Sequence, residues 1–153
     1  MDSVLSLDKP KYDLSQDQYR FYHENSYIIF KKLFSSEECD RVYQIFAENA
    51  DEKFSAIINL DREIPELQRV MRMPKVVSIV EGLLDSEAYG LMTQMLFKEA
   101  GSAYAYQSWE IHQDNAYHGN PNGVTLTINI VCKDSNVNNG TLFVFPGTHK
   151  EGL

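Results

Sequence analysis

The first half of the chain spaces its hydrophobic residues as amphipathic helices do. Ser15 is of a type that caps helix N-termini, and aromatic side chains in residues 16–24 recur at helical spacing after it. A second helix is predicted after Ser35, because Glu38 stands three residues further on and completes a capping-box pattern. One face of this second helix carries Cys39, Val42, Tyr43 and Phe46.

A third helix is predicted to begin at Pro74, since the first turn of a helix tolerates proline, and aliphatic residues dominate positions 76–84. Residues 50–73 are more polar and are interrupted by Pro65, so they predict a loop with room for one short helix. Residues 1–13 lack any periodicity and predict a mobile N-terminal arm.

The second half of the chain changes character and is rich in residues that favour strands. Turn-forming residues separate these stretches from one another. Including one early stretch, the predicted strands are residues 27–30, 88–98, 106–112, 124–131 and 141–145. Helices followed by consecutive strands predict an α+β domain in which helices pack on an antiparallel sheet.

Composition narrows the functional classes. A chain of 153 residues with 43% hydrophobic residues is expected to form one folded domain, here residues 14–153. The net charge of −8 weighs against nucleic acid or an anionic membrane as a partner. The N-terminus lacks the pattern of a signal peptide, and Cys39 and Cys132 fit reduced core residues. We therefore predict a cytoplasmic protein.

His112 and Asp114 are the residues that point to chemistry. On a strand, residues i and i+2 face the same side, so this imidazole and this carboxylate would converge on one point. With a second histidine they would form the two-histidine, one-carboxylate site that holds Fe(II) and leaves positions open for a co-substrate and O₂. The tripeptide alone is weak evidence for a metal site, because most His-x-Asp pairs are surface or core residues unrelated to metal binding.

Four further stretches carry a resemblance to a known family. Residues 14–29 and 33–39 are similar to its opening helices and strand, and residues 95–98 precede His112 by the expected hairpin. The fourth stretch, residues 138–150, reads Asn-Asn-Gly-Thr-Leu-Phe-Val-Phe-Pro-Gly-Thr-His-Lys. Together they resemble the phytanoyl-CoA dioxygenase family of Fe(II)- and 2-oxoglutarate-dependent oxygenases.

The resemblance implies a double-stranded β-helix, a jelly-roll of eight core strands with helices packed on it. It implies that His112 and Asp114 are iron ligands and that Lys98, Gln113 and Asn129 lie near 2-oxoglutarate. The family's third ligand, a distal histidine, and its 2-oxoglutarate-binding arginine normally lie beyond the Pro-Gly-Thr-His loop. Because the sequence stops at Leu153, we expect the C-terminal part of the β-helix to be missing. His149 and His118 remain weaker candidates for a third ligand.

Two functions are compatible with these observations. The first is a dioxygenase that uses Fe(II), 2-oxoglutarate and O₂ to hydroxylate a small organic substrate. The alternative is a catalytically inactive remnant that acts as a binding or interaction module. If strands are missing, the remaining sheet edges would be open, and we expect self-association through them.

Overall fold

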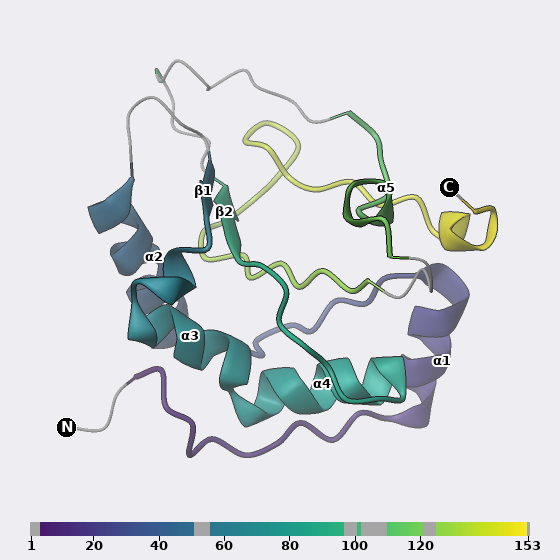
Figure 1. Cartoon of the computed structure of the whole chain (residues 1–153), viewed down its shortest axis with the longest axis horizontal. Helices are drawn as coiled ribbons and strands as arrows, with labels where there is room; N and C mark the ends of the chain where they lie inside the picture. Colours follow the sequence, from purple (N-terminus) through teal and green to yellow (C-terminus); the bar gives the residue numbers. More distant parts are fainter. Residues whose placement is uncertain (1–3, 51–55, 97–100, 102–109, 121–124, 153) are drawn as a thin grey trace.

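A computed structural model of the chain describes residues 4–50, 56–96, 101, 110–120 and 125–152. Four helices occupy one side of the molecule, and a two-stranded sheet stands beside them (Figure 1). A short helix, α5 (Asn115–His118), and a 3₁₀ turn, η2 (Thr148–Lys150), lie on the other side of the sheet from α2 (Figure 1). No helix in these ranges is long and apolar enough to cross a membrane.

Helices α1 (Gln16–Asn25) and α2 (Ser36–Asn49) begin as the sequence predicts. The hydroxyls of Ser15 and Ser35 each accept a hydrogen bond from the backbone N–H three residues on, and the backbone N–H of each serine donates to that residue's side-chain oxygen. These are complete capping boxes, which satisfy N–H groups that a helix start leaves without partners.

The buried face of α2 differs from the predicted one. Val42 and Ile45 are 3% and 2% exposed, whereas Tyr43 is 42% exposed. Together with Glu38 they follow the i, i+4, i+7 spacing of a helix face, so the helix is rotated relative to the face predicted from its apolar residues. On the predicted face, Val42 is buried and Phe46 packs partly buried against the core, whereas the ring of Tyr43 lies at the surface, 4.4 Å from the ammonium group of Lys133.

Residues 56–73 contain more regular structure than the predicted loop with one short helix, and the helix predicted to begin at Pro74 is confirmed. A 3₁₀ turn, η1 (Leu60–Arg62), leads to α3 (Pro65–Arg72) and then to α4 (Pro74–Leu84). Each helix has proline in its first turn, where the missing N–H costs nothing. Met73 joins the two helices and is 0% exposed, so the joint itself is part of the core.

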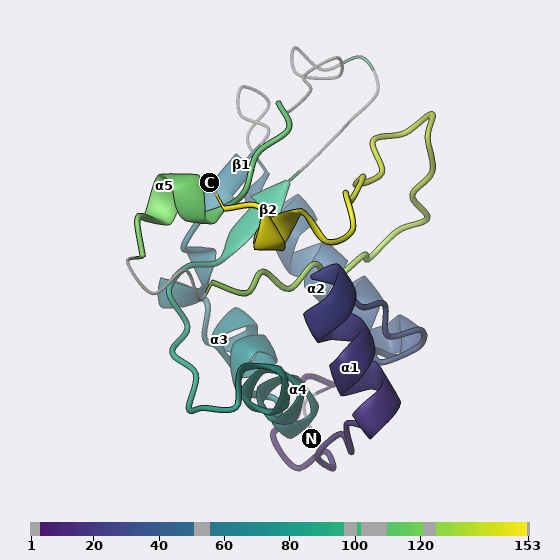
Figure 2. The same cartoon turned by 90° about the vertical axis from the view of Figure 1, so that its right-hand side faces the viewer.

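The core lies between α2, α3, α4 and the N-terminal segment, and Figure 2 shows α1 beside α4 at the edge of this layer. Leu5 is 0% exposed within this core, so residues 4–13 run along the helices (Figure 1). The mobility predicted for this segment stays a prediction. The buried core residues are Leu5, Val42, Ile45, Leu60, Leu67, Val70, Met73 and Val76.

The sheet consists of β1 (Ala56–Ile58) and β2 (Gln94–Leu96), paired antiparallel with Ile57 opposite Met95. Helices together with a small antiparallel sheet agree with the predicted α+β class. The double-stranded β-helix remains a prediction, since this pair is the only sheet within the ranges given above.

Several predicted strands are irregular in the structure. Residues 27–30, 125–131 and 141–145 pair with no strand in the described part of the chain, and Ile29 is 72% exposed instead of buried. A β-prone stretch becomes a strand only when a neighbour supplies hydrogen bonds, which is why its sequence alone overpredicts strands. Most of the strand predicted at 106–112 lies outside the described residues.

Candidate metal site

His112 lies in an irregular segment and Asp114 in the turn immediately before α5, so the strand predicted to end at His112 is not observed at that residue. Asp114 has helical backbone angles, φ −56° and ψ −32°. The carbonyl of Gln113 accepts a hydrogen bond from Ala116 N at 3.0 Å, and that of Asp114 accepts one from Tyr117 N at 3.0 Å. These bonds continue the turn into α5.

The turn nevertheless brings the two side chains together, which the strand argument had also predicted. His112 Nε2 lies 3.3 Å from Asp114 Oδ1, and the side chains are 31% and 42% exposed. Both donor atoms therefore meet at a position that solvent and a ligand can reach.

The contact of His112 Nδ1 with the backbone determines where Nε2 points. Its Nδ1 lies 2.6 Å from the carbonyl oxygen of Glu110. A carbonyl only accepts hydrogen bonds, so we assign the proton to Nδ1, and in the neutral ring the lone pair of Nε2 then points toward Asp114. The ring of Tyr117 packs edge-on against the imidazole, with centroids 5.1 Å apart. A hydrogen bond from the second ring nitrogen to a backbone carbonyl, as between Nδ1 and Glu110, is how proteins orient metal-binding histidines.

Thr127 orients the carboxylate. Its hydroxyl donates a hydrogen bond to Asp114 Oδ2, which leaves Oδ1 facing His112. Asn115 holds the same segment nearby, because its Oδ1 accepts a bond from Thr125 Oγ1 at 3.5 Å. We did not predict a role for Thr127. Its signal is the alternation of polar Thr125, Thr127 and Asn129 with apolar residues in this stretch.

These positions fit a divalent metal ion. At 3.3 Å, the Nε2 lone pair of a neutral imidazole and the carboxylate oxygen are close enough to bind one cation together. Donors bound at about 2.1 Å in adjacent coordination positions are about 3.0 Å apart, close to the observed separation. Imidazole with carboxylate is also a donor set that suits Fe(II). In the described part of the chain, no third histidine, cysteine or acidic residue joins this pair as a ligand group.

The three residues predicted to contact 2-oxoglutarate are placed differently. The amide of Gln113 donates to the carbonyl oxygens of Gly152 at 2.8 Å and Thr148 at 3.4 Å, so it holds the C-terminal loop. Asn129 is exposed. Lys98 lies outside the described residues. Their co-substrate role stays a prediction.

The two weaker candidates for a third ligand do not join the pair. His149 Nε2 lies 3.2 Å from the carbonyl oxygen of His23, at the end of α1. Gly147 N donates to Asn25 O at 3.0 Å, which docks the Pro-Gly-Thr-His loop on the same helix end. His118 ends α5 and is exposed.

Comparison with known proteins agrees with the resemblance seen in the sequence. The family model of phytanoyl-CoA dioxygenase (PhyH) matches residues 22–153, which is most of the chain. The chain belongs to the phytanoyl-CoA dioxygenase family. No solved structure matches it significantly.

Two kinds of characterised relative are similar to the chain. It is 23% identical over 160 aligned residues to ectoine dioxygenase of Bordetella bronchiseptica, covering 90% of this chain and 50% of that protein. It is 24% identical over 165 aligned residues to the peroxisomal phytanoyl-CoA dioxygenases of Bos taurus and Homo sapiens, covering 92% of this chain and 49% of each. The chain spans about half the length of the curated relatives that it matches.

Proposed function

We propose that this chain is the N-terminal portion of an Fe(II)- and 2-oxoglutarate-dependent dioxygenase that hydroxylates a small organic substrate. The observation that carries the proposal is the pair formed by His112 Nε2 and Asp114 Oδ1 at 3.3 Å. Family membership supports it, since the relatives matched are named as dioxygenases. The corresponding whole-protein fold is the double-stranded β-helix.

Each residue of the site has a separate task. His112 Nε2 and Asp114 Oδ1 bind the iron, which when bound supplies the oxidative chemistry with O₂ and 2-oxoglutarate. The carbonyl of Glu110 holds the imidazole in the tautomer that leaves Nε2 free. Thr127 holds the carboxylate so that one oxygen faces the imidazole. A third ligand and the remaining co-substrate contacts are expected from elsewhere in the protein, with Lys98 and Asn129 as candidate contacts in this chain.

The first test is metal binding by the purified chain. Anaerobic titration with Fe(II), or with Co(II) followed by its visible absorption, should show one weak site. His112→Ala should weaken binding at least about tenfold, because one of the two ligands is lost. His118→Ala is the matched control, since it removes an exposed imidazole six residues away and should leave binding unchanged. Equal binding by wild type and His112→Ala would exclude His112 as a ligand.

The second test concerns the reaction. In a protein that contains this chain together with the remaining ligands, Fe(II)-dependent conversion of 2-oxoglutarate to succinate is expected. His112→Ala should abolish this turnover and His118→Ala should retain it. Succinate formation by His112→Ala at the parent rate would contradict the proposal.

A further inference from the structure

A cavity of about 490 Å³ lies beside the start of α2, away from the His112–Asp114 pair. Its walls come from the N-terminal segment at residues 9–12, the connection at residues 29–33, the first turn of α2 and Lys75 of α4. None of the residues that form the candidate metal site lines it. Nothing in the proposed function uses this cavity.

The cavity collects positive charge in a chain that is otherwise acidic. Five of the nine lysines of the sequence line it, although the chain carries a net charge of −8. Among the described residues that line the cavity, Glu38 is the one acidic residue, and none is an arginine. The lysines are Lys9, Lys11, Lys31, Lys32 and Lys75.

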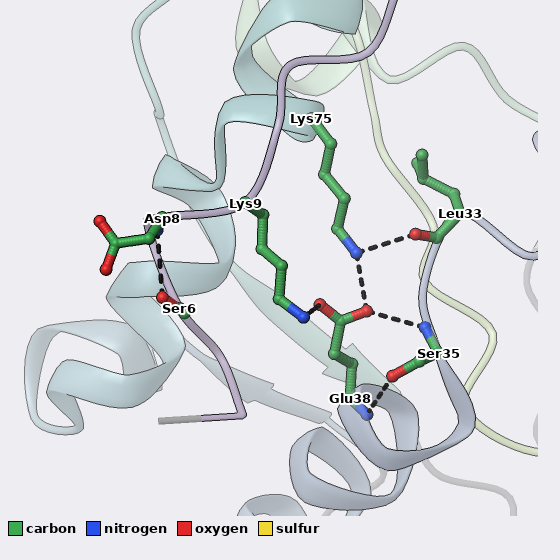
Figure 3. Close-up of polar contacts among 7 residues, drawn as sticks. All are labelled: Ser6, Asp8, Lys9, Leu33, Ser35, Glu38 and Lys75. Carbon is green, nitrogen blue, oxygen red and sulfur yellow. Dashed lines mark hydrogen bonds and ion pairs between the residues drawn. The ribbon is translucent and has the colours of Figure 1, made fainter. Parts of the chain in front are cut away.

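Within the described part of the chain, one oxygen of the buried Glu38 carboxylate is held by hydrogen bonds, whereas the other, Oε1, has no hydrogen-bond partner (Figure 3). Lys75 Nζ donates to Glu38 Oε2 at 2.7 Å and to the carbonyl oxygen of Leu33 at 2.8 Å. The backbone N–H of Ser35 donates to the same carboxylate oxygen at 2.7 Å. Lys9 Nζ lies 3.9 Å from the other oxygen, Oε1 (Figure 3). Lys75 and Glu38 thus balance each other's charge and are the buried residues of the lining.

Three lysines remain without a counter-charge. Lys11, Lys31 and Lys32 are exposed, and none forms an ion pair with a carboxylate in the described part of the chain. Like charges around one concavity repel each other, and the low-dielectric walls strengthen the field within it. A bound anion would relieve this repulsion, so the charge of the lining favours an anionic ligand.

We propose that this cavity binds a small anion that carries two or more phosphate charges. Lysine binds phosphate as a compact point charge, whereas planar carboxylates are recognised best by the arginine fork that is missing from this lining. Tyr12 and Ser35 add donors: the Tyr12 oxygen accepts a bond from Gln18 Nε2 and the Ser35 hydroxyl oxygen accepts one from Glu38 N, so both O–H groups are left to donate. The volume exceeds that of one water-sized site many times over and accommodates a diphosphate group.

The backbone conformation of Lys32 allows its positive charge to be removed without disturbing the fold. Its φ of 60° is in the left-handed region, which asparagine adopts more readily than most residues. Lys32→Asn therefore removes the charge without backbone strain. Lys31→Gln and Lys11→Gln remove charges in neighbouring walls, and Lys150→Gln removes an exposed lysine outside the cavity as the matched control.

Inorganic pyrophosphate is the probe, titrated calorimetrically into the metal-free 153-residue chain at low ionic strength. We expect one site per chain, about five- to tenfold weaker in Lys31→Gln and in Lys32→Asn, and unchanged within twofold in Lys150→Gln. Affinity should fall as salt is added, because exposed charges are screened. Absence of saturable binding, or equal weakening by Lys150→Gln, would overturn the proposal.

A second measurement needs no variant. Pyrophosphate should raise the thermal unfolding temperature of the wild-type chain, because a ligand bound to the folded state stabilises it. Tricarballylate, which carries three carboxylates, should raise it much less at the same concentration. An equal shift with both anions would show a general charge effect and contradict a phosphate site.

Discussion

The buried ion pair between Glu38 and Lys75 provides the most direct test of the helical layer. Glu38 is 2% exposed, and replacing it by glutamine leaves the Lys75 ammonium buried without its counter-charge. Breaking a buried pair from one side costs about 3–5 kcal/mol. The carbonyl of Leu33 and the ring of Phe34, 4.1 Å from Nζ, still contact Lys75, so we expect the free energy of unfolding to fall by about 3 kcal/mol. The side-chain oxygen of glutamine can still accept the capping-box bond from Ser35 N. The substitution therefore tests the contribution of the charge to stability without removing the helix cap.

The assay is urea unfolding followed by circular dichroism at pH 7. Lys75→Met should destabilise by a similar amount, and the double variant by at least about 1 kcal/mol less than the two losses together. Asp17→Asn is the control, because its pair with Arg20 is 88% and 73% exposed and should contribute less than about 1 kcal/mol. Equal losses in Glu38→Gln and Asp17→Asn, or strictly additive losses in the cycle, would refute the reasoning.

The same pair sets a pH dependence. Burial alone would raise the pKa of Glu38, but the hydrogen bonds from Lys75 and from the Ser35 backbone, with the charges of Lys75 and Lys9, hold that pKa below its usual 4.5. A carboxyl whose folded pKa is depressed stabilises the protein above its unfolded pKa and loses this contribution as the pH falls through the folded value. The difference in unfolding free energy between wild type and Glu38→Gln should therefore shrink below pH 4.5. A constant difference down to pH 3 would contradict this assignment.

Three further predictions concern other parts of the chain. Leu5→Ala should lower the free energy of unfolding by about 2–5 kcal/mol, because Leu5 is 0% exposed; a loss below about 1 kcal/mol in urea titration would contradict its place in the core. Burial raises the pKa of the Cys132 thiol to about 11, so alkylation by iodoacetamide at pH 8 should be much slower than for free cysteine and should accelerate toward pH 11. Residues 142–145 are all more than half exposed and apolar, so light scattering should show concentration-dependent association that Phe143→Ser reduces; a monodisperse monomer would refute this.

Local chemistry made the helices predictable from the sequence. The caps at Ser15 and Ser35 depend on residues three positions apart, so the pattern contains everything needed. The buried face of α2 was harder, because it depends on what packs against it, and one partner is Leu5 from a segment without any periodicity. The strands were overpredicted for the same reason: their hydrogen-bond partners are distant in sequence.

The sequence predicted that His112 and Asp114 meet, but it did not predict the backbone conformation that brings them together. His112 and Asp114 meet in the structure, yet through a turn instead of a strand, since two residues apart can converge in either conformation. Gln113 points to the C-terminal loop, and no spacing rule would have revealed that contact across 39 positions. Thr127 could be found only by asking which polar residue lies opposite Asp114, a question of tertiary structure.

The docking of the Pro-Gly-Thr-His loop on α1 has a consequence for how the protein is made. His149 contacts the carbonyl of His23 across 126 positions of sequence. During synthesis, α1 is therefore complete well before the loop that contains His149 has been translated. At about 5–20 residues per second this delay is roughly 6–25 s, far longer than a helix needs to form. The capped helices can assemble during this interval around Leu5, Met73 and their neighbours. The loop that follows Phe145 can dock on α1 only after this interval, and the bond from Gln113 to Gly152 connects that loop to the segment that carries His112 and Asp114.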